Sequence, residues 1–221
     1  MFNWFKKRAK QFTLPEFWNE YENSFSPDTH KDLKSARFVV LDTETTGFSY
    51  SKDRILCIGA VEILNYEIQI AHSFEIYIKQ ERFNEKTVEI HGIIKNERIK
   101  TLTEYEAIEK FLEYLGNAII IAHHAKFDVT MINKMLERHG FPHLKNKILD
   151  TVRLYNATRI KTNFNRQEEL SLDNIADKYL LDVSDRHTAA GDALITALIF
   201  LKTTTILKNK KGMTLKTLFK V

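Results

Sequence analysis

The strongest constraint on the fold is a block of three apolar, β-branched runs between residues 37 and 78. The runs are RFVVLD, ILCIGAVEIL and EIQIAHSFEIYI, and only Asn65 and Tyr66 separate the last two. Two such runs joined by a very short connection predict a tight antiparallel pairing. The third run alternates apolar and polar residues, which is typical of a strand with one buried face. The main part of the chain therefore begins with three strands of antiparallel character.

Helical patterns follow this block. Residues 103–116 open with the capping box TEYE, carry one apolar face and reach Gly116, so they predict a capped helix. The run NAIIIAH is fully apolar and predicts a buried parallel strand. Further helices are expected before Gly140, at 150–158, after Ser171 and from Thr188 to about Leu207, with a short strand near 147–149. This order predicts an α/β domain with a mixed sheet.

The chain of 221 residues suits one full domain with an extension, or at most two small domains. We divide it into an N-terminal helical extension and linker at 1–36, a main domain at 37–207 and a short basic tail at 208–221. In the extension, Phe17, Tyr21 and Phe25 form one face of a helix after Pro15. We expect this helix to pack on its own domain; the alternatives are a partner or a membrane surface met through Phe2, Trp4 and Phe5.

Charge, cysteine content and hydropathy limit the possible partners and the cellular location of the protein. A net charge of +4 and a sequence pI of about 9.0 fit a nucleic-acid partner, and fit surplus surface lysine equally well. The single cysteine, Cys57, excludes an internal disulfide and lies in an apolar run, so we expect a buried structural thiol. Because no run of about 18 apolar residues and no signal-peptide core are found, we expect no membrane span and a cytoplasmic protein.

Two acids stand at the end of the first apolar run, in VVLDTETTG at residues 39–47. Successive side chains on a strand point to opposite faces, so Asp42 and Glu44 share a face if the strand continues through Thr43. Adjacent like charges repel, which predicts a cation there, and hard oxygen ligands favour Mg²⁺ or Mn²⁺. Gly47 permits a sharp turn directly afterwards.

Two further acids are candidates for the same site. Asp128 follows the apolar strand at 119–122 and begins the next helix, where an acid is most often a cap. In DRHTAAGDALITAL, His187 is expected at the start of a helix and Asp192 in its second turn. Taken alone, His187 would be a capping or surface histidine. Asp192 leads into the most apolar helix of the chain and needs a partner, which a metal would supply.

Taken together, VVLDTETTG, IIIAHHAKFD and HTAAGD resemble the three exonuclease motifs of the DEDDh family, which includes the epsilon proofreading subunit of bacterial DNA polymerase III. VEIHGI, at residues 88–93, resembles a further signature of that family. The resemblance runs from about Arg37 to Leu207. Two positions depart from it: His123 and His124 stand where His-Asn is usual, and Cys57 stands where Glu or Gln is common.

The resemblance implies the ribonuclease H-like exonuclease fold, an α/β domain whose central mixed β-sheet has three antiparallel strands first and is flanked by α-helices. It implies that Asp42, Glu44, Asp128 and Asp192 hold two divalent ions, Mg²⁺ or Mn²⁺, with Asp42 bridging them. One ion would activate a water and the other would stabilise the leaving 3′ oxygen. His187 is implied to be the general base. Four carboxylates so close together predict raised pKa values in the metal-free protein.

The same resemblance implies the substrate: the 3′-terminal nucleotide of a single-stranded or frayed DNA end, released as a 5′-monophosphate. The backbone from Thr43 to Thr45 would lie near the terminal 3′ hydroxyl. Ile90, His91 and Phe127 would line the base pocket, although plain core packing also accounts for Ile90 and Phe127.

Three interpretations of the activity stay open. The first is a 3′–5′ exonuclease acting on DNA, and the second is the same chemistry on RNA, since no segment recognisably reads a 2′ hydroxyl. The third is a proofreading module that needs a DNA polymerase or clamp. The short end KNKKGMTLKTLFKV weakens the third, although TLKTLF could dock a partner and its lysines could contact phosphate. A non-enzymatic nucleic-acid binder is disfavoured because all five catalytic positions are present.

Overall fold

A six-stranded sheet with the order β4-β3-β2-β1-β5-β6 forms the centre of the structure, a computed structural model that describes residues 13–25, 32–80, 100–159, 170–211 and 214–221. Its strands are β1 Phe38–Thr45, β2 Ile55–Leu64, β3 Glu67–Ile78, β4 Thr101–Leu102, β5 Ile119–Ala122 and β6 Ile148–Asp150. β1, β2 and β3 pair antiparallel, whereas β4, β5 and β6 each run parallel to their neighbour. The expectation of a mixed sheet with three antiparallel strands first is confirmed.

The turn between β2 and β3 is built as the sequence predicts. Asn65 and Tyr66 both have positive φ angles, 54° and 65°, and they join Leu64 directly to Glu67. Positive φ at both central residues is the geometry of a type I′ turn, whose twist matches that of the strands it joins. A two-residue connection therefore sets the register of the hairpin from Leu64 opposite Glu67 to Glu62 opposite Gln69, and the register shifts between Glu62 and Ala60.

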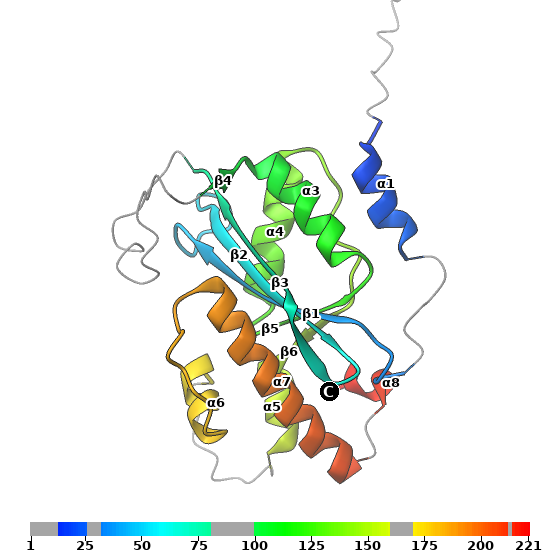
Figure 1. Ribbon diagram of the computed structural model, residues 1–221, viewed down its shortest axis with the longest axis vertical. Coiled ribbons are helices and arrows are strands. Elements are labelled where there is room, and N and C mark those ends of the chain that lie inside the picture. Colours follow the sequence, from blue (N-terminus) through cyan, green and yellow to red (C-terminus); the bar gives the residue numbers. More distant parts are fainter. Residues whose placement is uncertain (1–12, 26–31, 81–99, 160–169, 212–213) are drawn as a thin grey trace, which may run out of the picture.

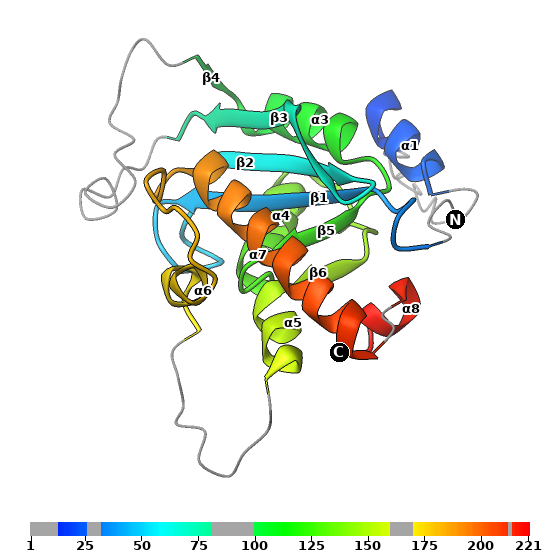
Figure 2. The same ribbon diagram turned by 60° about the horizontal axis from the view of Figure 1, so that its bottom comes forward.

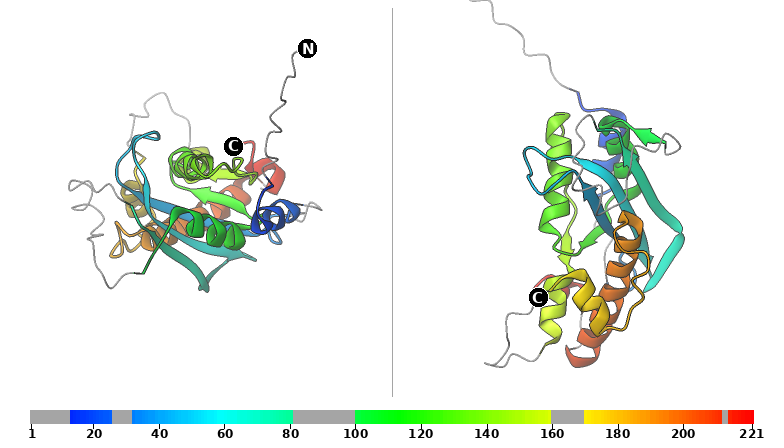
Figure 3. Two further views of the ribbon diagram at one scale, coloured as in Figure 1. Left: turned by 90° about the horizontal axis from the view of Figure 1, so that it is seen from above. Right: turned by 90° about the vertical axis from the view of Figure 1, so that its left-hand side faces the viewer.

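Helices cover both faces of the sheet (Figures 1, 2 and 3). One face packs against α3 Glu104–Leu115 and α4 Lys126–Arg138, and α1 Glu16–Asn23 packs on α3. The other face packs against α5 Thr151–Thr158, α7 Ala189–Lys211 and α8 Leu215–Leu218, and α6 Leu172–Lys178 packs on α5 and α7. Side chains of β1 point alternately to the two faces of the sheet. Val39 and Leu41 lie in the core on the side of α3 and α4, and Phe38 and Val40 lie in the core on the side of α7.

Local signals set most helix boundaries. The capping box of α3 is present, because Glu106 N donates to Thr103 Oγ1 over 3.2 Å and Thr103 N donates to Glu106 Oε2 over 2.8 Å. Gly116 follows α3 with a φ of 47°, a left-handed value that suits glycine. Ser171 caps α6 by accepting from Asn174 N. These predicted caps are confirmed, and so is the end of α4 just before Gly140.

Several boundaries differ from the expectation. α7 begins at Ala189 and runs to Lys211, so it starts later and ends later than predicted. β4 has only two residues, too few for a sequence pattern, and its pairing with Tyr77 and Ile78 holds it in the sheet. α8 has only four residues and forms because its Leu215 and Leu218 side chains are buried against the domain.

The N-terminal helix packs on its own domain, as expected. Trp18 is fully buried, and its ring stacks on Phe141 at a centroid distance of 5.3 Å. Tyr21 Oη donates to Asn146 Oδ1 over 2.6 Å and accepts from Lys145 N over 2.8 Å. The predicted apolar face missed Trp18, which is the most buried side chain of α1. Phe2, Trp4 and Phe5 lie outside the described residues.

α7 is long and apolar enough to cross a membrane if only length and composition are considered. Its segment Ala189–Asn209 has a mean hydropathy of 1.5, but 61% of that stretch is buried within the domain. Ala197, Phe200 and Leu207 lie in the core formed with β1 and β2. α7 is therefore a core helix of this fold, visible across the sheet in Figure 2.

Candidate active site

Three carboxylates converge at the C-terminal end of β1. Asp42 and Glu44 occupy alternate positions of the strand and share the face of Phe38 and Val40, which is the face that α7 covers. Asp192 reaches the same place from the first turn of α7. One carboxylate oxygen from each of the three residues lies within 4.8 Å of the others. We call these three residues the acidic cluster.

Asp128 approaches from the opposite side of the sheet. It is buried in the first turn of α4, and its Oδ1 accepts from Thr43 N over 3.0 Å and from Thr43 Oγ1 over 2.8 Å. Thr43 faces α4 because it alternates with Asp42 and Glu44 along the strand. Asp128 lies outside the acidic cluster by the distance given above, yet its charge raises the pKa of Asp42.

Gly59 allows α7 to come close enough to contribute Asp192. Gly59 lies on β2 directly opposite Asp42. A Cβ at this position would lie 2.2 Å from the carbonyl carbon of Ala189 and 2.3 Å from Ala190 N, both backbone atoms. The first turn of α7 thus packs directly onto the bare backbone of β2. The sequence analysis missed this role, since ILCIGAVEI looks like an ordinary strand.

A cation also reaches the acidic cluster. Arg186 Nη1 donates to Asp192 Oδ2, while its Nε and Nη2 donate to Asp173 Oδ1 and Oδ2 over 2.6 and 2.9 Å. Asp173 belongs to α6, so the guanidinium joins α6 to α7. The sequence analysis missed Arg186 because its two partners lie 13 residues before it and 6 residues after it, with no motif to connect them.

Burial and mutual repulsion raise the pKa values of these acids. Burial is the largest cause for Asp42, whose pKa lies well above the usual range, and the charges of Asp128, Asp192 and Glu44 add to it. Burial raises the pKa of Glu44 to about 7, with Asp192 as the next cause. Burial also raises the pKa of Asp128 to about 7, against the hydrogen bonds from Thr43. The expectation of raised carboxylate pKa values is confirmed at these three residues.

The acidic cluster has the properties of a divalent-metal site. Its donors are carboxylate oxygens, which suit Mg²⁺ and Mn²⁺. Asp192 is buried, and its Oδ1 has no hydrogen-bond partner among the residues that the structure describes. A buried carboxylate oxygen without a partner is costly, and a bound cation would remove that cost. The residues present therefore fit a divalent ion.

His187 lies outside the helix that it was expected to begin. Its φ is 65°, a left-handed value that cannot continue a helix, and its side chain is exposed. Thr188 instead starts the helical hydrogen bonding: its Oγ1 accepts from Gly191 N over 3.1 Å, and its carbonyl accepts from Asp192 N over 2.9 Å. The expectation that Asp192 falls in the second turn is wrong, because the later start places it in the first.

The unusual His-His pair has a local explanation. His123 is partly buried, its Nδ1 lies 2.9 Å from Thr151 Oγ1, and its Nε2 lies 2.9 Å from Leu170 O. Burial lowers the pKa of His123 to about 4. His124 is exposed with a φ of 56°, in the left-handed region where Asn and His are both enriched. A histidine can therefore replace the usual asparagine without changing the backbone.

Aromatic rings gather beside Asp128. Phe127 lies 5.8 Å from Phe48 and 5.9 Å from Tyr50, measured between ring centroids. Phe48 is 82% exposed and Tyr50 is 37% exposed, whereas Phe127 is partly buried and packs against the core, in agreement with the core-packing alternative. Ile90 and His91, the other residues expected in a base pocket, lie outside the described residues. Phe48 and Tyr50 were missed, although they follow the first motif closely in TGFSYSKDR.

The loop that carries these rings is tied by Asp53. Asp53 Oδ1 accepts from Thr46 Oγ1 over 3.0 Å, and Oδ2 accepts from Ser49 N over 2.8 Å. A Cβ at Gly47 would lie 2.6 Å from the Asp53 carboxylate, so glycine is needed for this closure. Thr45 is buried, and its Oγ1 donates to Gly47 O over 2.8 Å. The turn after β1 is thus a defined structure rather than a loose connection.

Two other residues lie near the site: Cys57, which was expected to be a structural thiol, and Asp150, which the sequence did not indicate. Cys57 is buried opposite Glu44, and burial raises the pKa of its thiol, as expected of a structural cysteine. Asp150, at the end of β6, was not considered, yet its charge helps to raise the pKa of Asp128. Asp150 also caps α5 by accepting from Val152 N over 2.9 Å.

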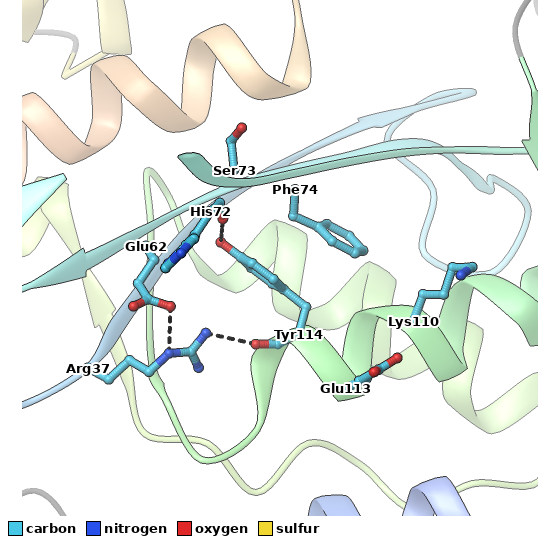
Figure 4. A pocket seen from close by; sticks show the side chains of 8 residues that line it. All are labelled: Arg37, Glu62, His72, Ser73, Phe74, Lys110, Glu113 and Tyr114. Atoms are coloured by element: carbon cyan, nitrogen blue, oxygen red, sulfur yellow. Dashed lines mark hydrogen bonds and ion pairs between the residues drawn. The ribbon is translucent and has the colours of Figure 1, made fainter. Parts of the chain in front are cut away.

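A cavity of about 550 Å³ lies apart from the acidic cluster, between β3 and α3 (Figure 4). Arg37 lines it, but its guanidinium already donates to Glu62 over 2.7 Å and to the carbonyls of Leu115 and Tyr114. Because these contacts occupy the guanidinium, Arg37 is a poor candidate for phosphate binding there.

Comparison with known proteins identifies the family of the chain and agrees with its fold. The chain belongs to the RNase_T family, described as Exonuclease, which matches residues 39–200. The family match and the fold place it among the DEDD exonucleases of the ribonuclease H-like superfamily. The chain is 34% identical over 175 residues to the PolC-type DNA polymerase III of Staphylococcus epidermidis and over 171 residues to that of Staphylococcus aureus. These alignments cover 79% and 77% of this chain but only 12% and 11% of those polymerases.

Solved structures show the same fold. E. coli exonuclease I in complex with a dT13 oligonucleotide matches with a TM-score of 0.66 at 18% identity, over 79% of this chain and 42% of that chain. Cell-death related nuclease 4 matches with a TM-score of 0.68 at 14% identity, over 78% of this chain and 65% of that chain. At such identities the likeness concerns the fold alone.

Proposed function

We propose that this chain is a metal-dependent 3′–5′ exonuclease of the DEDDh type that removes nucleoside 5′-monophosphates from DNA 3′ ends. The observation that carries the proposal is the convergence of Asp42, Glu44 and Asp192, with Asp128 beside them, in a chain of the exonuclease family. Buried acids held this close destabilise a metal-free protein, which favours a role in holding cations.

The four acids would hold two divalent ions, Mg²⁺ or Mn²⁺, which when bound supply the electrophilic stabilisation that phosphodiester hydrolysis requires. Asp42 is central among these ligands, since its pKa responds to the charges of all three others. Thr43 orients Asp128 with two hydrogen bonds, and Gly59 lets Asp192 approach. The sheet, α4 and α7 thus preorganise the carboxylates on rigid elements.

His187 is proposed as the general base that takes the proton of the attacking water. Its imidazole is exposed, and histidine is the side chain most often used as a general acid or base in catalysis. The adjacent Arg186 contacts Asp192, so the segment that carries His187 is anchored at the acidic cluster. This proximity supports the assignment of His187 to the reaction.

The aromatic cluster of Phe48, Tyr50 and Phe127 supports an unpaired 3′ end as the substrate. Exposed rings beside a metal site can stack on bases of any sequence, as in proteins that bind single strands. Thr43 and Thr45 would lie near the terminal 3′ hydroxyl. The relatives at 34% identity are PolC-type DNA polymerases, which favours DNA over RNA for this chain. A nucleic-acid substrate also fits the expected cytoplasmic location.

Association with a polymerase is the second candidate, favoured by the PolC-type relatives. The apolar residues Leu215 and Leu218 of the TLKTLF segment are buried in this chain's own domain. They are therefore engaged within the molecule rather than presented to a partner. We propose that the isolated chain is active and that any contact with a polymerase or clamp uses another surface.

The test is a nuclease assay on 3′-labelled single-stranded DNA, mispaired duplex DNA and RNA, with Mg²⁺ and with EDTA. We expect Mg²⁺-dependent release of labelled monophosphate from DNA, and none from the Glu44→Gln variant. Glu109→Gln, which changes an exposed acid on α3, is the matched control and should keep full activity. Release from RNA alone would replace the DNA assignment, and dependence on an added polymerase would favour the second candidate. No release from any substrate would refute the exonuclease proposal.

A further inference from the structure

Arg186 makes more ionic contacts than a surface arginine normally does. Its guanidinium forms a bidentate pair with Asp173, at 2.6 and 2.9 Å, and a third bond to Asp192. The Arg186 side chain is only 16% exposed, whereas that of Asp173 is 53% exposed. One positive charge therefore bridges a half-exposed acid and a buried acid of the proposed metal site.

The two oxygens of Asp192 have different environments. Oδ2 accepts from Arg186, whereas Oδ1 has no partner among the described residues. A divalent cation at Oδ1 would lie close to the guanidinium, and the two positive charges would repel each other. Binding of the cation and the Arg186–Asp192 contact are therefore in competition.

We propose that Arg186 is an internal counter-ion that neutralises Asp192 in the metal-free protein and gives way when a divalent cation binds. Asp173 makes the exchange possible, because it keeps two bonds to Arg186 after Asp192 is released. Asp173 thus draws Arg186 away from the metal site and keeps it near His187. This inference rests on the proposed function only in that the acidic cluster takes a divalent cation.

Substitutions of Arg186 and of Asp173 should change the affinity for Mg²⁺ in opposite directions. Arg186→Gln removes the competing charge, so Mg²⁺ should bind more tightly. Among the described residues, Asp173→Asn leaves Arg186 with Asp192 as its one ion-pair partner, so Mg²⁺ should bind more weakly. A coupling between two sites is typically about fivefold or more in affinity, and we expect at least that change in each direction.

The experiment is calorimetric titration of the full chain with Mg²⁺ at pH 8.5, above the pKa values of about 7 for Glu44 and Asp128, with all variants compared at the same pH. Thermal unfolding without metal is the second measurement. Without metal, Arg186→Gln should have a lower melting temperature than the natural protein. Adding Mg²⁺ should raise the melting temperature of Arg186→Gln by more than that of the natural protein. Arg138→Gln, which removes a similar ion pair with Glu104, should leave Mg²⁺ affinity unchanged.

Several results would overturn the inference. Weaker or unchanged Mg²⁺ binding by Arg186→Gln would do so, as would unchanged or tighter binding by Asp173→Asn. If either variant fails to fold by circular dichroism, Arg186→Lys replaces it, since a lysine keeps the charge but loses the bidentate pair with Asp173 and should also bind Mg²⁺ more weakly. Nuclease activity is measured separately: the expected order of affinities without DNA cleavage would uphold this inference while refuting the proposed function.

Discussion

Replacing Gly59 by alanine should separate α7 from the sheet at the acidic cluster. The added Cβ would lie 2.2 Å from a backbone atom of Ala189, whereas ordinary contacts begin at 3.4 Å. To relieve this clash, the first turn of α7 or β2 would have to shift by roughly 1 Å, because backbone atoms cannot rotate away as a side chain can. Asp192 belongs to that turn and would move away from Asp42 and Glu44.

Two consequences of Gly59→Ala can be given magnitudes. Overpacking of a tight core contact costs about 1–3 kcal/mol, which for a chain of this size lowers the melting temperature by about 2–4 °C per kcal/mol. A displacement of about 1 Å at catalytic groups can reduce turnover about 10²-fold. Thermal unfolding, Mg²⁺ titration and release of mononucleotides from single-stranded DNA measure these effects.

Gly116→Ala is the control for loss of stability alone. Gly116 ends α3 with a φ of 47°, and a Cβ there would meet nothing within 4 Å, so alanine would be strained without touching the acidic cluster. This variant should lose stability but keep its Mg²⁺ affinity and its turnover in the folded state. If Gly59→Ala behaved in the same way, the close approach of α7 would not be what assembles the site.

Three other predictions follow from the structure. Burial raises the pKa of Glu44 to about 7 from an ordinary 4.5, so the folded metal-free protein binds this proton more tightly than the unfolded chain does, and stability is lost as pH rises from about 4.5 to 7. As the pH rises over that range, the melting temperature of the metal-free protein should therefore fall relative to that of Glu44→Gln. If the difference between the two melting temperatures stayed constant, the raised pKa of Glu44 would not be its cause. His187→Ala should cut turnover about 10²-fold or more while Mg²⁺ affinity, measured by calorimetry, stays nearly unchanged; equal loss of both would argue against a general base. Trp18→Ala should lower the free energy of unfolding in urea by about 3–5 kcal/mol, and Glu16→Ala, at an exposed position of α1, by little, whereas similar small effects would show that α1 is not part of the core.

Much of the fold could be predicted because its signals are local. Side-chain alternation placed Asp42 and Glu44 on one face of β1, and the structure confirms it. A capping box and Gly116 marked the two ends of α3, and Gly140 marked the end of α4, since those contacts span only a few residues. Two elements shorter than one pattern repeat could not be predicted. Pairing with β3 holds β4 in the sheet, and α8, although it has a local cap between Thr214 and Thr217, depends on the burial of Leu215 and Leu218.

The chemical identity of the site came from the sequence by itself. The types and order of its acids, and the strand period that aims two of them together, follow from local chain geometry. Tertiary structure alone decided how these acids meet. Gly59 lets α7 lie on β2, Thr43 holds Asp128, and Arg186 neutralises Asp192, through contacts between residues on different elements. No local pattern encodes such contacts, because their energies depend on distances set only when the whole chain has packed.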